Sequence, residues 1–417
     1  MTPIPHLTLT TLLCLALAAC GGGGGGGGAD VAALPNAVPA AAAPVATGTA
    51  VTDAPAVPSA PAAALSAASL AFLNLDTANL PSYTPVLPAY YDAGVRADDN
   101  TPASNRASSA GATLGRVLFY DKALSLNRTV ACASCHQQTQ GFGDSQRFSR
   151  GFAGGLTTAH AMRLGNVRYY APGSMFWDKR AATLEAQATQ PIQHPVEMGF
   201  DAANGGLSAL LARLQTLPYY PELFTLAFGD ASITEARIQQ AVAQFQRAMV
   251  ATNSRWDAGY APNFNPALPD AGLNTPIASF SAQEERGRQL FMAGRGQGGL
   301  ACAACHQPPT FALAANSRSN GLDAGETTVF KAPSLKSVSR SGAFMHDGRL
   351  ASLEQVVEHY NSGVQDGPAL DNRLRAGNGP RRLNLSAADK AALVAFLRTL
   401  DDTALAGDAR FSSPFRQ

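Results

Sequence analysis

The clearest pattern along the chain is an apolar stripe at helical spacing near residue 240. Ile238, Ala241, Val242 and Phe245 recur every three or four residues, with polar residues between them. This spacing places the apolar side chains on one face of an α-helix. Ser232-Ile-Thr-Glu235 comes shortly before the stripe and has the form of a capping box, in which a serine oxygen and a glutamate carboxylate satisfy free amide groups of the first turn. We therefore predict a helix capped by Ser232.

Three more capping sequences occur later in the chain: Ser281-Ala-Gln-Glu284, Ser352-Leu-Glu-Gln355 and Ser386-Ala-Ala-Asp389. Each is followed by apolar residues at helical spacing, which after Ser386 continue to Leu400. No stretch shows the sustained alternation of apolar and polar residues that marks a half-buried strand. The predicted fold class is therefore mostly α.

The first 20 residues have the pattern of an export signal. An apolar run of 13 residues from Leu7 to Ala19 is too short for a bilayer span of about 20 residues. It ends in Leu17-Ala-Ala-Cys20, which resembles a bacterial lipobox. We therefore expect a lipoprotein signal peptide over residues 1–20, with Cys20 lipidated. A simple cleaved signal and an ordinary apolar terminus are the alternatives, because residues 1–6 contain no Lys or Arg.

A low-complexity segment follows the signal. Gly, Ala and Pro account for 31 of the 44 residues in 21–64, beginning with eight consecutive glycines. A segment of this composition cannot pack a core and behaves as a mobile spacer. We expect a flexible, disordered tether over residues 21–75 and a folded part that begins near residue 70–80.

The length of 417 residues allows two domains of about 100–200 residues each after the tether. Charged residues make up only 15% of the chain, partly because the first 95 residues contain no Lys, Arg or Glu. All 31 basic residues therefore lie in 96–417, together with all but four of the 30 acidic residues. This mild basic excess contains no Lys/Arg run, which argues against a partner nucleic acid.

The cysteines indicate the cofactor. Besides Cys14 and Cys20, they form two Cys-x-x-Cys-His units, Cys132-Ala-Ser-Cys135-His136 and Cys302-Ala-Ala-Cys305-His306. This unit is typical of c-type haem attachment, in which two thiols bond to the haem vinyl groups and the imidazole ligates iron. One copy alone is also compatible with a zinc or redox site. Two copies in an exported chain, with no thiol left over, favour two covalently bound haem c groups.

The similarity between the two units extends beyond the cysteines. Gly115-Arg-Val-Leu-Phe119 precedes the first unit and Gly287-Arg-Gln-Leu-Phe291 precedes the second. Similar sequences at a fixed distance indicate an internal duplication. We predict an N-terminal haem domain over residues 76–270 and a C-terminal haem domain over residues 271–417.

Further motifs lie between and after the haem units: Phe176-Trp-Asp-Lys-Arg-Ala181, Pro195-Val-Glu-Met-Gly199, Lys331-Ala-Pro-Ser-Leu335 and Phe344-Met-His-Asp-Gly348. Together with the haem units they resemble the bacterial diheme cytochrome c peroxidase and MauG family over about residues 105–405. The resemblance implies two cytochrome c-like domains in tandem. In that family the N-terminal haem is peroxidatic and the C-terminal haem transfers electrons.

The resemblance also implies roles for single residues. His136 and His306 would be the proximal iron ligands. Glu197 matches the distal acid–base residue of the family, and Gln187 matches its neighbour. A carboxylate in an apolar pocket can move the proton that peroxide cleavage requires. A residue that merely ends a surface loop is the alternative for Glu197.

Two more positions match residues near the haems of the family. Trp177 matches an aromatic residue between the two haems, where an indole can relay an electron; a packing role in the core is compatible with this. Arg180 is expected to pair with a haem propionate, with a surface ion pair as the alternative.

Tyr360 is expected to be the sixth ligand of the second haem, where peroxidases of the family usually have Met. His359, Met345 and no protein ligand are the alternatives. A thioether ligand raises the haem potential, whereas a phenolate stabilises ferric iron. A His/Tyr haem would therefore favour the storage of oxidising equivalents over a reductively activated peroxidase cycle.

The family also holds an ion at the domain junction. Asn166 is the nearest match to the family's calcium ligand, with the carbonyls of Ser341 and Ala343 as partners, and oxygen ligands of this kind suit Ca²⁺. An ordinary turn residue is the alternative for Asn166. On the distal side of the first haem we expect an open or water-bound iron, with His160 as the alternative ligand.

The predicted activity is the reduction of hydrogen peroxide to water, with electrons from a small c-type cytochrome or a quinol. One alternative is a MauG-like oxidase that stores two oxidising equivalents and acts on a protein substrate. A non-catalytic electron-transfer cytochrome is the other. The expected location is the periplasm, with a lipid anchor in the outer membrane. Members of the family often dimerise, so a homodimer remains open.

Overall fold

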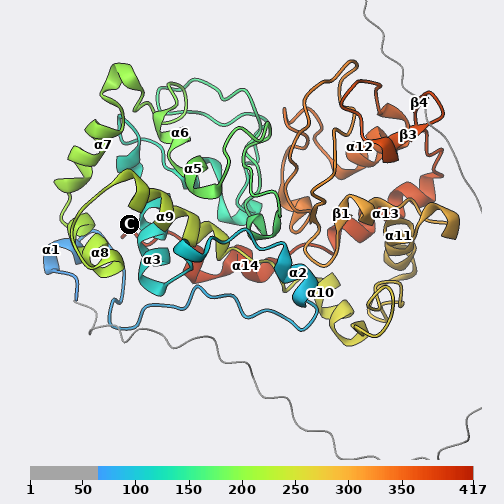
Figure 1. The fold of residues 1–417 in the computed structure, drawn as a ribbon, viewed down its shortest axis with the longest axis horizontal. Coiled ribbons are helices and arrows are strands. Elements are labelled where there is room, and N and C mark those ends of the chain that lie inside the picture. Colours follow the sequence, from blue (N-terminus) through green and yellow to red (C-terminus); the bar gives the residue numbers. More distant parts are fainter. Residues whose placement is uncertain (1–63, 417) are drawn as a thin grey trace, which may run out of the picture. The chain divides into compact units, whose positions relative to one another are not determined.

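The folded part of the chain consists of helices arranged in two halves (Figure 1). The structure is a computed structural model that describes residues 64–416, which belong to one compact unit. The predicted signal peptide, Cys20 and most of the predicted tether lie outside the described residues.

The described residues form short and medium-length helices with very little sheet, which confirms the mostly helical prediction. The α-helices are α1 (Ala67–Leu70), α2 (Ala93–Ala97), α3 (Ser109–Tyr120), α4 (Cys132–Cys135), α5 (Leu184–Ala188), α6 (Gln190–Gln193), α7 (Gly206–Gln215), α8 (Tyr219–Phe228), α9 (Glu235–Arg247), α10 (Arg255–Tyr260), α11 (Ala282–Met292), α12 (Leu353–Glu358), α13 (Ala387–Arg398) and α14 (Thr403–Gly407). Two antiparallel pairs of strands complete the structure: β1 (His306–Gln307) with β2 (Ala312–Leu313), and β3 (Arg375–Ala376) with β4 (Gly379–Pro380). Within residues 64–416, no helix has both the length and the hydropathy of a membrane span.

Each half is centred on a pair of crossing helices. In the N-terminal half α3 packs against α9, and in the C-terminal half α11 packs against α13. Both crossings depend on a glycine. A Cβ on Gly115 would lie 2.0 Å from the carbonyl oxygen of Ala241, and a Cβ on Gly287 would lie 1.9 Å from that of Ala392. Because these glycines open the repeated Gly-Arg-x-Leu-Phe sequences, the packing reproduces the internal duplication seen in the sequence.

The predicted caps at Ser281, Ser352 and Ser386 are confirmed, since each serine oxygen accepts a hydrogen bond from the amide three residues later. The capping box predicted at Ser232 is wrong. The cap of α9 is Thr234, whose hydroxyl oxygen accepts from the amide of Arg237 at 3.3 Å.

A preceding turn explains the displaced cap. The guanidinium of Arg237 lies 2.6 Å from Asp230, and the same carboxylate accepts from the amide of Ser232 at 2.9 Å. Ser232 is therefore part of an aspartate turn, and the cap of the helix lies two residues after the predicted one.

The folded part begins earlier than predicted. Leu65 and Leu73 are buried in the core of the N-terminal half. Leu73 also forms an isolated β-bridge with Phe415, close to the other end of the chain. Residues 65–75, which the composition assigns to the tether, therefore belong to the folded part.

The cores of the two halves do not divide at residue 270. Trp256, on the N-terminal side of that boundary, packs in the core around α11 and α13. Phe411, on the C-terminal side, packs in a core with Phe119 and Phe245 of the N-terminal half. The end of the chain thus returns to the first half, where Figure 1 shows α14 below α9. The predicted domain boundary was drawn from motif spacing, which carries no information about such a return.

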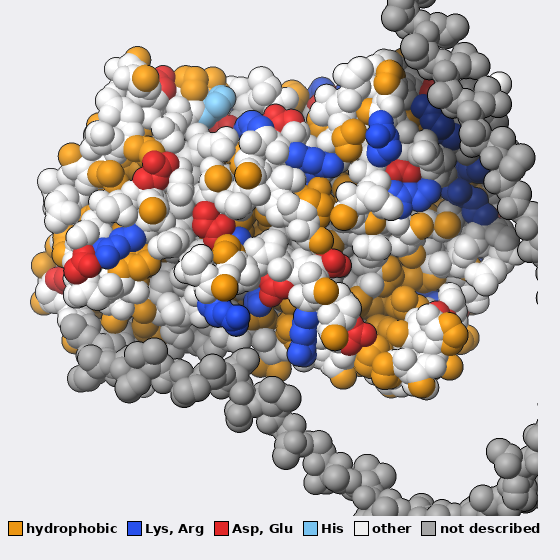
Figure 2. All heavy atoms as spheres, viewed as in Figure 1, with side chains coloured by type: hydrophobic (Ala, Val, Ile, Leu, Met, Phe, Trp, Pro, Cys, Tyr) orange, Lys and Arg blue, Asp and Glu red, His pale blue; other side chains and the backbone are white. Residues whose placement is uncertain are grey.

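The surface combines charged side chains of both signs with small apolar groups, as Figure 2 shows for one face. The large hydrophobic side chains exposed among residues 64–416 are Phe72, Val86, Leu156 and Leu268. Isolated apolar side chains of this kind are common on protein surfaces and indicate no binding site by themselves.

Candidate haem sites and the junction between them

The first Cys-x-x-Cys-His unit consists of α4 and the residue that follows it. Cys132 and Cys135 bound α4, and His136 ends it. The Nδ1 atom of His136 lies 2.9 Å from the carbonyl oxygen of Phe142. A histidine that donates from Nδ1 to a carbonyl has Nε2 free to bind a metal. Burial lowers the pKa of His136 and so favours the neutral imidazole that metal binding requires.

The second unit has a similar arrangement. Cys302 begins a short 3₁₀ turn, and His306 begins β1. The ring of Phe291 lies 6.4 Å from that of His306, as the ring of Phe119 lies 6.5 Å from that of His136. Burial lowers the pKa of His306 to about 4, so this imidazole is also neutral.

A cavity of about 240 Å³ adjoins the second unit. Its walls are mostly apolar, which suits a large ligand with few polar groups. Residues of both halves line it, including Cys302, Cys305, His306 and Tyr360 of the C-terminal half and His160, Arg163 and Trp177 of the N-terminal half.

The residues present fit covalently bound haem. Cys132, Cys135, Cys302 and Cys305 are free thiols rather than disulfides. Burial raises the pKa of both Cys132 and Cys302 to about 12, so these thiols are neutral. The Nδ1 atom of His306 is buried without a hydrogen-bond partner among the described residues. Each unit thus places two cysteine sulfurs beside a neutral imidazole, the donor set of haem c.

Asn320 contacts all three candidate sixth ligands of the second haem. Its carbonyl oxygen lies 3.1 Å from Nε2 of His359, and its side-chain amide donates to the sulfur of Met345 at 3.2 Å. The Asn320 side chain also lies beside the Tyr360 hydroxyl: burial raises the pKa of Tyr360, and Asn320 acts in the opposite direction. Because Tyr360 lines the cavity and His359 does not, the structure favours the tyrosine over the histidine.

The backbone at Tyr360 is irregular. Helix α12 ends at Glu358, and residues His359–Gly363 continue it as a single π-helical turn. Such turns are rare and often occur at functional sites, because they change the direction of one side chain relative to its neighbours.

Glu197 lies in the turn after α6, near the first haem unit. Its charge contributes to the raised thiol pKa of both Cys132 and Cys135, so its carboxylate is within electrostatic reach of this unit. Burial raises the pKa of Glu197, and the nearby His194 and Arg180 oppose that shift. A carboxyl group with a raised pKa can accept and return a proton closer to neutral pH.

His194 is the nearest neighbour of this carboxylate, with Nδ1 at 3.7 Å from Oε1 of Glu197. The same Nδ1 atom accepts hydrogen bonds from the backbone amides of Val196 and Glu197, both at 3.3 Å. The backbone of the same turn thus holds the His194 ring beside the Glu197 carboxylate.

Gln187 and Arg180 have less defined surroundings. Gln187 lies half-buried on α5, and its side chain makes no hydrogen bond within residues 64–416. Arg180 is exposed, pairs with Asp178 at 3.0 Å and lies 3.5 Å from the centre of the Phe176 ring. These contacts correspond to the surface ion pair that was the alternative for Arg180, and the propionate contact stays a prediction.

Trp177 connects to the first half through its indole, which donates to the carbonyl oxygen of His160 at 2.8 Å. The ring of His160 is held at both nitrogens: Nδ1 lies 3.1 Å from the Gln146 carbonyl oxygen, and Nε2 lies 3.2 Å from the Ser341 hydroxyl. The ring also lines the cavity of the second unit. The ligand on the distal side of the first haem, with His160 as the alternative, stays a prediction.

A second internal repeat, not noticed in the sequence, forms the junction between the halves. Residues 175–181 and 344–350 each form a loop closed by an antiparallel bridge. Trp177 and His346 occupy the same place in the two loops, and each is followed by an Asp–Arg ion pair. They are 169 positions apart, nearly the 170 that separate the haem units. That spacing was the signal in the sequence that could have revealed the repeat.

Each of the two loops accepts a backbone hydrogen bond from the opposite half. The amide of Lys331 donates to the carbonyl oxygen of Trp177 at 2.8 Å, and the amide of His160 donates to that of His346 at 2.9 Å. Each loop is thus held by the opposite half, and the duplicated units are in direct contact at the junction.

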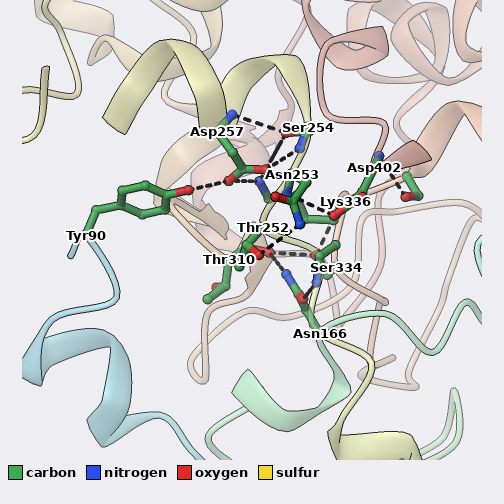
Figure 3. Close-up of polar contacts among 12 residues, drawn as sticks. Tyr90, Asn166, Thr252, Asn253, Ser254, Asp257, Thr310, Ser334, Lys336 and Asp402 are labelled. Carbon is green, nitrogen blue, oxygen red and sulfur yellow. Dashed lines mark hydrogen bonds and ion pairs between the residues drawn. The ribbon is translucent and has the colours of Figure 1, made fainter. Parts of the chain in front are cut away.

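Two of the predicted calcium ligands, Asn166 and Ala343, accept hydrogen bonds from protein groups in the structure. The side-chain oxygen of Asn166 accepts from the amide of Ala251 at 2.8 Å, and its side-chain amide donates to the carbonyl oxygen of Thr310 at 3.2 Å; Figure 3 shows Asn166 among these polar contacts. The Ser341 hydroxyl donates to the carbonyl oxygen of Ala343 at 2.8 Å. A calcium ion shared by these three residues stays a prediction.

Comparison with known proteins agrees with the geometry. The family model for di-haem cytochrome c peroxidase matches residues 109–263 and 281–373. Methylamine utilization protein MauG of Methylophilus methylotrophus is 33% identical over 321 residues, which cover 73% of this chain and 86% of that protein. Cytochrome-c peroxidase IdrP1 of Denitromonas iodatirespirans is 28% identical over 366 residues, which cover 74% of this chain and 88% of that protein.

A solved structure of a MauG-like protein associated with microbial copper homeostasis is also similar. It has a TM-score of 0.62 and 30% sequence identity, and the match covers 81% of this chain and 98% of that one. The two haem-attachment units, the duplicated helix pairs and these matches agree. The chain belongs to the di-haem cytochrome c peroxidase family and is an oxidoreductase of that kind.

Proposed function

We propose that the chain reduces hydrogen peroxide to water at the N-terminal haem, with electrons that arrive through the C-terminal haem. The haem groups would supply the redox chemistry, and each peroxide consumes two electrons and two protons to give two waters. The observation that carries this proposal is the Glu197 carboxyl, which is close enough to affect Cys132 and Cys135 and has a pKa raised by burial.

The role of Glu197 is to move a proton between the two peroxide oxygens. A partly buried carboxylate is a stronger base than a fully exposed one, and burial raises the pKa of Glu197 although His194 and Arg180 oppose the shift. After taking a proton from one oxygen, the carboxyl group can return it to the other as the bond between them breaks.

Trp177 is proposed as the link between the two haems. It belongs to the N-terminal half, its indole is fixed by the His160 carbonyl, and its ring lines the cavity of the second unit. The tryptophan therefore has contacts with both halves where an electron must cross.

The donor proposed is a small c-type cytochrome or a quinol, which agrees with the name cytochrome-c peroxidase carried by relatives. We also propose a periplasmic location with a lipid anchor at Cys20. This part rests on the signal and lipobox patterns in the first 20 residues.

Tyr360 favours a second candidate function, an oxidase that takes its electrons from a protein substrate. Tyr360 lines the cavity of the second unit, whereas His359 does not. A phenolate ligand would stabilise the oxidised second haem and make it a poor relay for an incoming electron. The similarity to MauG and to a MauG-like protein supports this candidate.

Rapid mixing of the ferric holoprotein with hydrogen peroxide separates the candidates. Continuous peroxide consumption in the presence of a reduced c-type cytochrome supports the first. A spectral change that persists for minutes and is not discharged by the cytochrome supports the second. Unchanged Soret absorption, together with an EPR spectrum of two low-spin haems, would refute both and leave a non-catalytic electron-transfer cytochrome.

A further inference from the structure

Six Lys and Arg side chains are buried among residues 64–416: Arg116, Arg163, Arg247, Arg288, Lys331 and Lys336. A buried charge is costly unless an opposite charge or several hydrogen bonds compensate it. Three of the six have a carboxylate partner, which is Glu185 for Arg247, Glu285 for Arg288 and Asp257 for Lys336. The chain therefore provides an anion for some of its buried cations but not for all.

Lys336 shows what full compensation looks like (Figure 3). Its ammonium lies 2.6 Å from Asp257, and that carboxylate also accepts hydrogen bonds from Tyr90 and Ser254. Arg116 is compensated differently, by the carbonyl and hydroxyl oxygens of Ser412, and it does not line the cavity of the second haem unit.

Arg163 lacks comparable partners. One terminal nitrogen donates to the carbonyl oxygen of Ser334 at 3.2 Å, whereas Nε is buried without a partner among the described residues. The charge of Asp401 acts to raise the pKa of Arg163. The Asp401 carboxylate, however, accepts a hydrogen bond from the Ser339 hydroxyl and forms no ion pair with Arg163 within residues 64–416. Burial lowers the pKa of Arg163 to about 10, so the side chain remains a cation at neutral pH.

Lys331 likewise has no carboxylate partner among the described residues. Its ammonium contacts the sulfur of Met162 at 3.1 Å and lies 5.1 Å from the centre of the Tyr170 ring. A thioether is a weak hydrogen-bond acceptor. Burial, and to a smaller extent Lys179, lower the pKa of Lys331 to about 8. The chain thus holds a second buried cation without a carboxylate.

Arg163 and Lys331 line the same cavity, the one next to Cys302, Cys305 and His306. The other cations in its wall are accounted for. Arg373 pairs with Asp371, and the exposed Arg295 and Arg318 donate to backbone carbonyls. Arg163 and Lys331 are therefore the two buried cations of this cavity that have no carboxylate partner among residues 64–416.

A haem carries two propionate carboxylates, one for each of these cations. We propose that Arg163 and Lys331 bind the propionates of the haem held by Cys302, Cys305 and His306. This inference rests on the proposed function insofar as it requires a haem at the second unit. Charge-assisted contacts of this kind are short and strong, and they would fix the orientation of the haem at the junction.

The internal repeat offers a comparison for Arg163. The amides of His160 and Lys331 make equivalent bonds to the two repeated loops, so the residue three positions after each occupies an equivalent place. That residue is Arg163 in the first half and Ser334 in the second. Only one copy carries the guanidinium, which points to a ligand of this cavity rather than to the backbone.

The test uses holoprotein variants that each remove one charge: Arg163→Gln, Lys331→Met and, as a control in the same wall, Arg295→Gln. Resonance Raman bands of the propionate bending modes report hydrogen bonding to the carboxylates, and spectroelectrochemistry reports the potential of each haem. We expect Arg163→Gln and Lys331→Met to shift these bands and to lower the potential of the second haem, because an uncompensated carboxylate favours ferric iron. Arg295→Gln should leave the bands unchanged.

Arg163→Lys keeps the charge and should keep the potential close to that of the parent, even if the Gln variant fails to fold. The haem content of each protein is measured first. A parent protein with fewer than two haems would refute the proposed function. Two haems with propionate bands that respond to neither Arg163→Gln nor Lys331→Met would overturn this inference alone.

Discussion

Trp177 and His346 occupy equivalent positions in two repeated loops, and their rings meet with centroids 6.4 Å apart and planes inclined by 65°. The carbonyl oxygen of each accepts a hydrogen bond from the opposite half, from Lys331 and His160. His346 is in turn stacked on Phe330 at 4.0 Å. The indole is therefore fixed by both halves of the chain, at the place where we propose that an electron passes between the haem units.

Replacement of Trp177 by Phe tests this position. The ring is kept, but the bond to the His160 carbonyl and the oxidisable indole are lost. We expect normal haem content and electron transfer between the haems that is slower by about tenfold or more, or at least about 1.4 kcal/mol in activation free energy. Stopped-flow absorption after addition of peroxide measures this rate.

Trp256→Phe is the matched control. Trp256 is buried beside Lys336 and Phe311 and does not line the cavity. Its replacement should leave the rate unchanged. If Trp177→Phe and Trp256→Phe transfer electrons equally fast, the relay role of Trp177 is excluded.

Gly287→Ala tests the helix crossing of the C-terminal half. The added Cβ would lie 1.9 Å from the carbonyl oxygen of Ala392, so α11 and α13 must move apart. Overpacking of this kind costs about 1–3 kcal/mol, and the shift of Phe291 on α11 disturbs the packing around His306. We expect a lower unfolding temperature and less haem at the second unit.

Gly296→Ala is the control for this change, because a Cβ there would meet no atom within 4 Å. Thermal unfolding of both variants, with haem content measured in parallel, provides the comparison. Equal stability of the two variants would show that the crossing is not as tight as described.

The pH dependence of the peroxide reaction tests Glu197. Burial raises its pKa above the ordinary value of 4.5. The basic carboxylate is present above the raised pKa and is lost as the pH falls through it. The rate of the peroxide reaction should therefore decline with falling pH while the pH is still above 4.5.

Glu197→Gln should lower the rate of the peroxide reaction by about 10²–10⁴, because the amide cannot accept the proton. The decline of the rate with falling pH should then disappear. Glu354→Gln, at an exposed glutamate paired with Arg398, should have no effect. If the decline with falling pH persists in the Glu197→Gln protein, another group is responsible for it, and His194 at 3.7 Å is the first to examine.

The haem units could be predicted from the sequence because their chemistry is local. Two cysteines and a histidine within five residues define each attachment unit, whatever the rest of the chain does. The duplication was also readable, because Gly115 and Gly287 are followed by the same pattern. Helix caps at Ser281, Ser352 and Ser386 depend on residues three positions apart, and these were correct.

Contacts between distant segments could not be predicted. Asn320 reaches His359 and Met345 from 39 and 25 positions away, and no motif marks it. The return of Phe411 to the N-terminal core, and the meeting of Arg163 with Ser334 across 171 positions, depend on the tertiary fold. The cap at Ser232 failed because a local competitor, the turn at Asp230, holds its amide.

The identity of the sixth ligand decides between the two candidate functions, and Tyr360→Phe tests it. If the phenol oxygen binds the second haem, its loss should remove one low-spin EPR signal and raise the potential of that haem, because a phenolate stabilises ferric iron. Tyr169→Phe is the matched control, since its hydroxyl is buried without a partner among the described residues. His359→Gln should keep the signal, because Nε2 of His359 already lies 3.1 Å from the Asn320 carbonyl oxygen. A signal that survives in Tyr360→Phe and disappears in His359→Gln would transfer the ligand to His359 and, with it, remove the structural argument for a protein-oxidising enzyme.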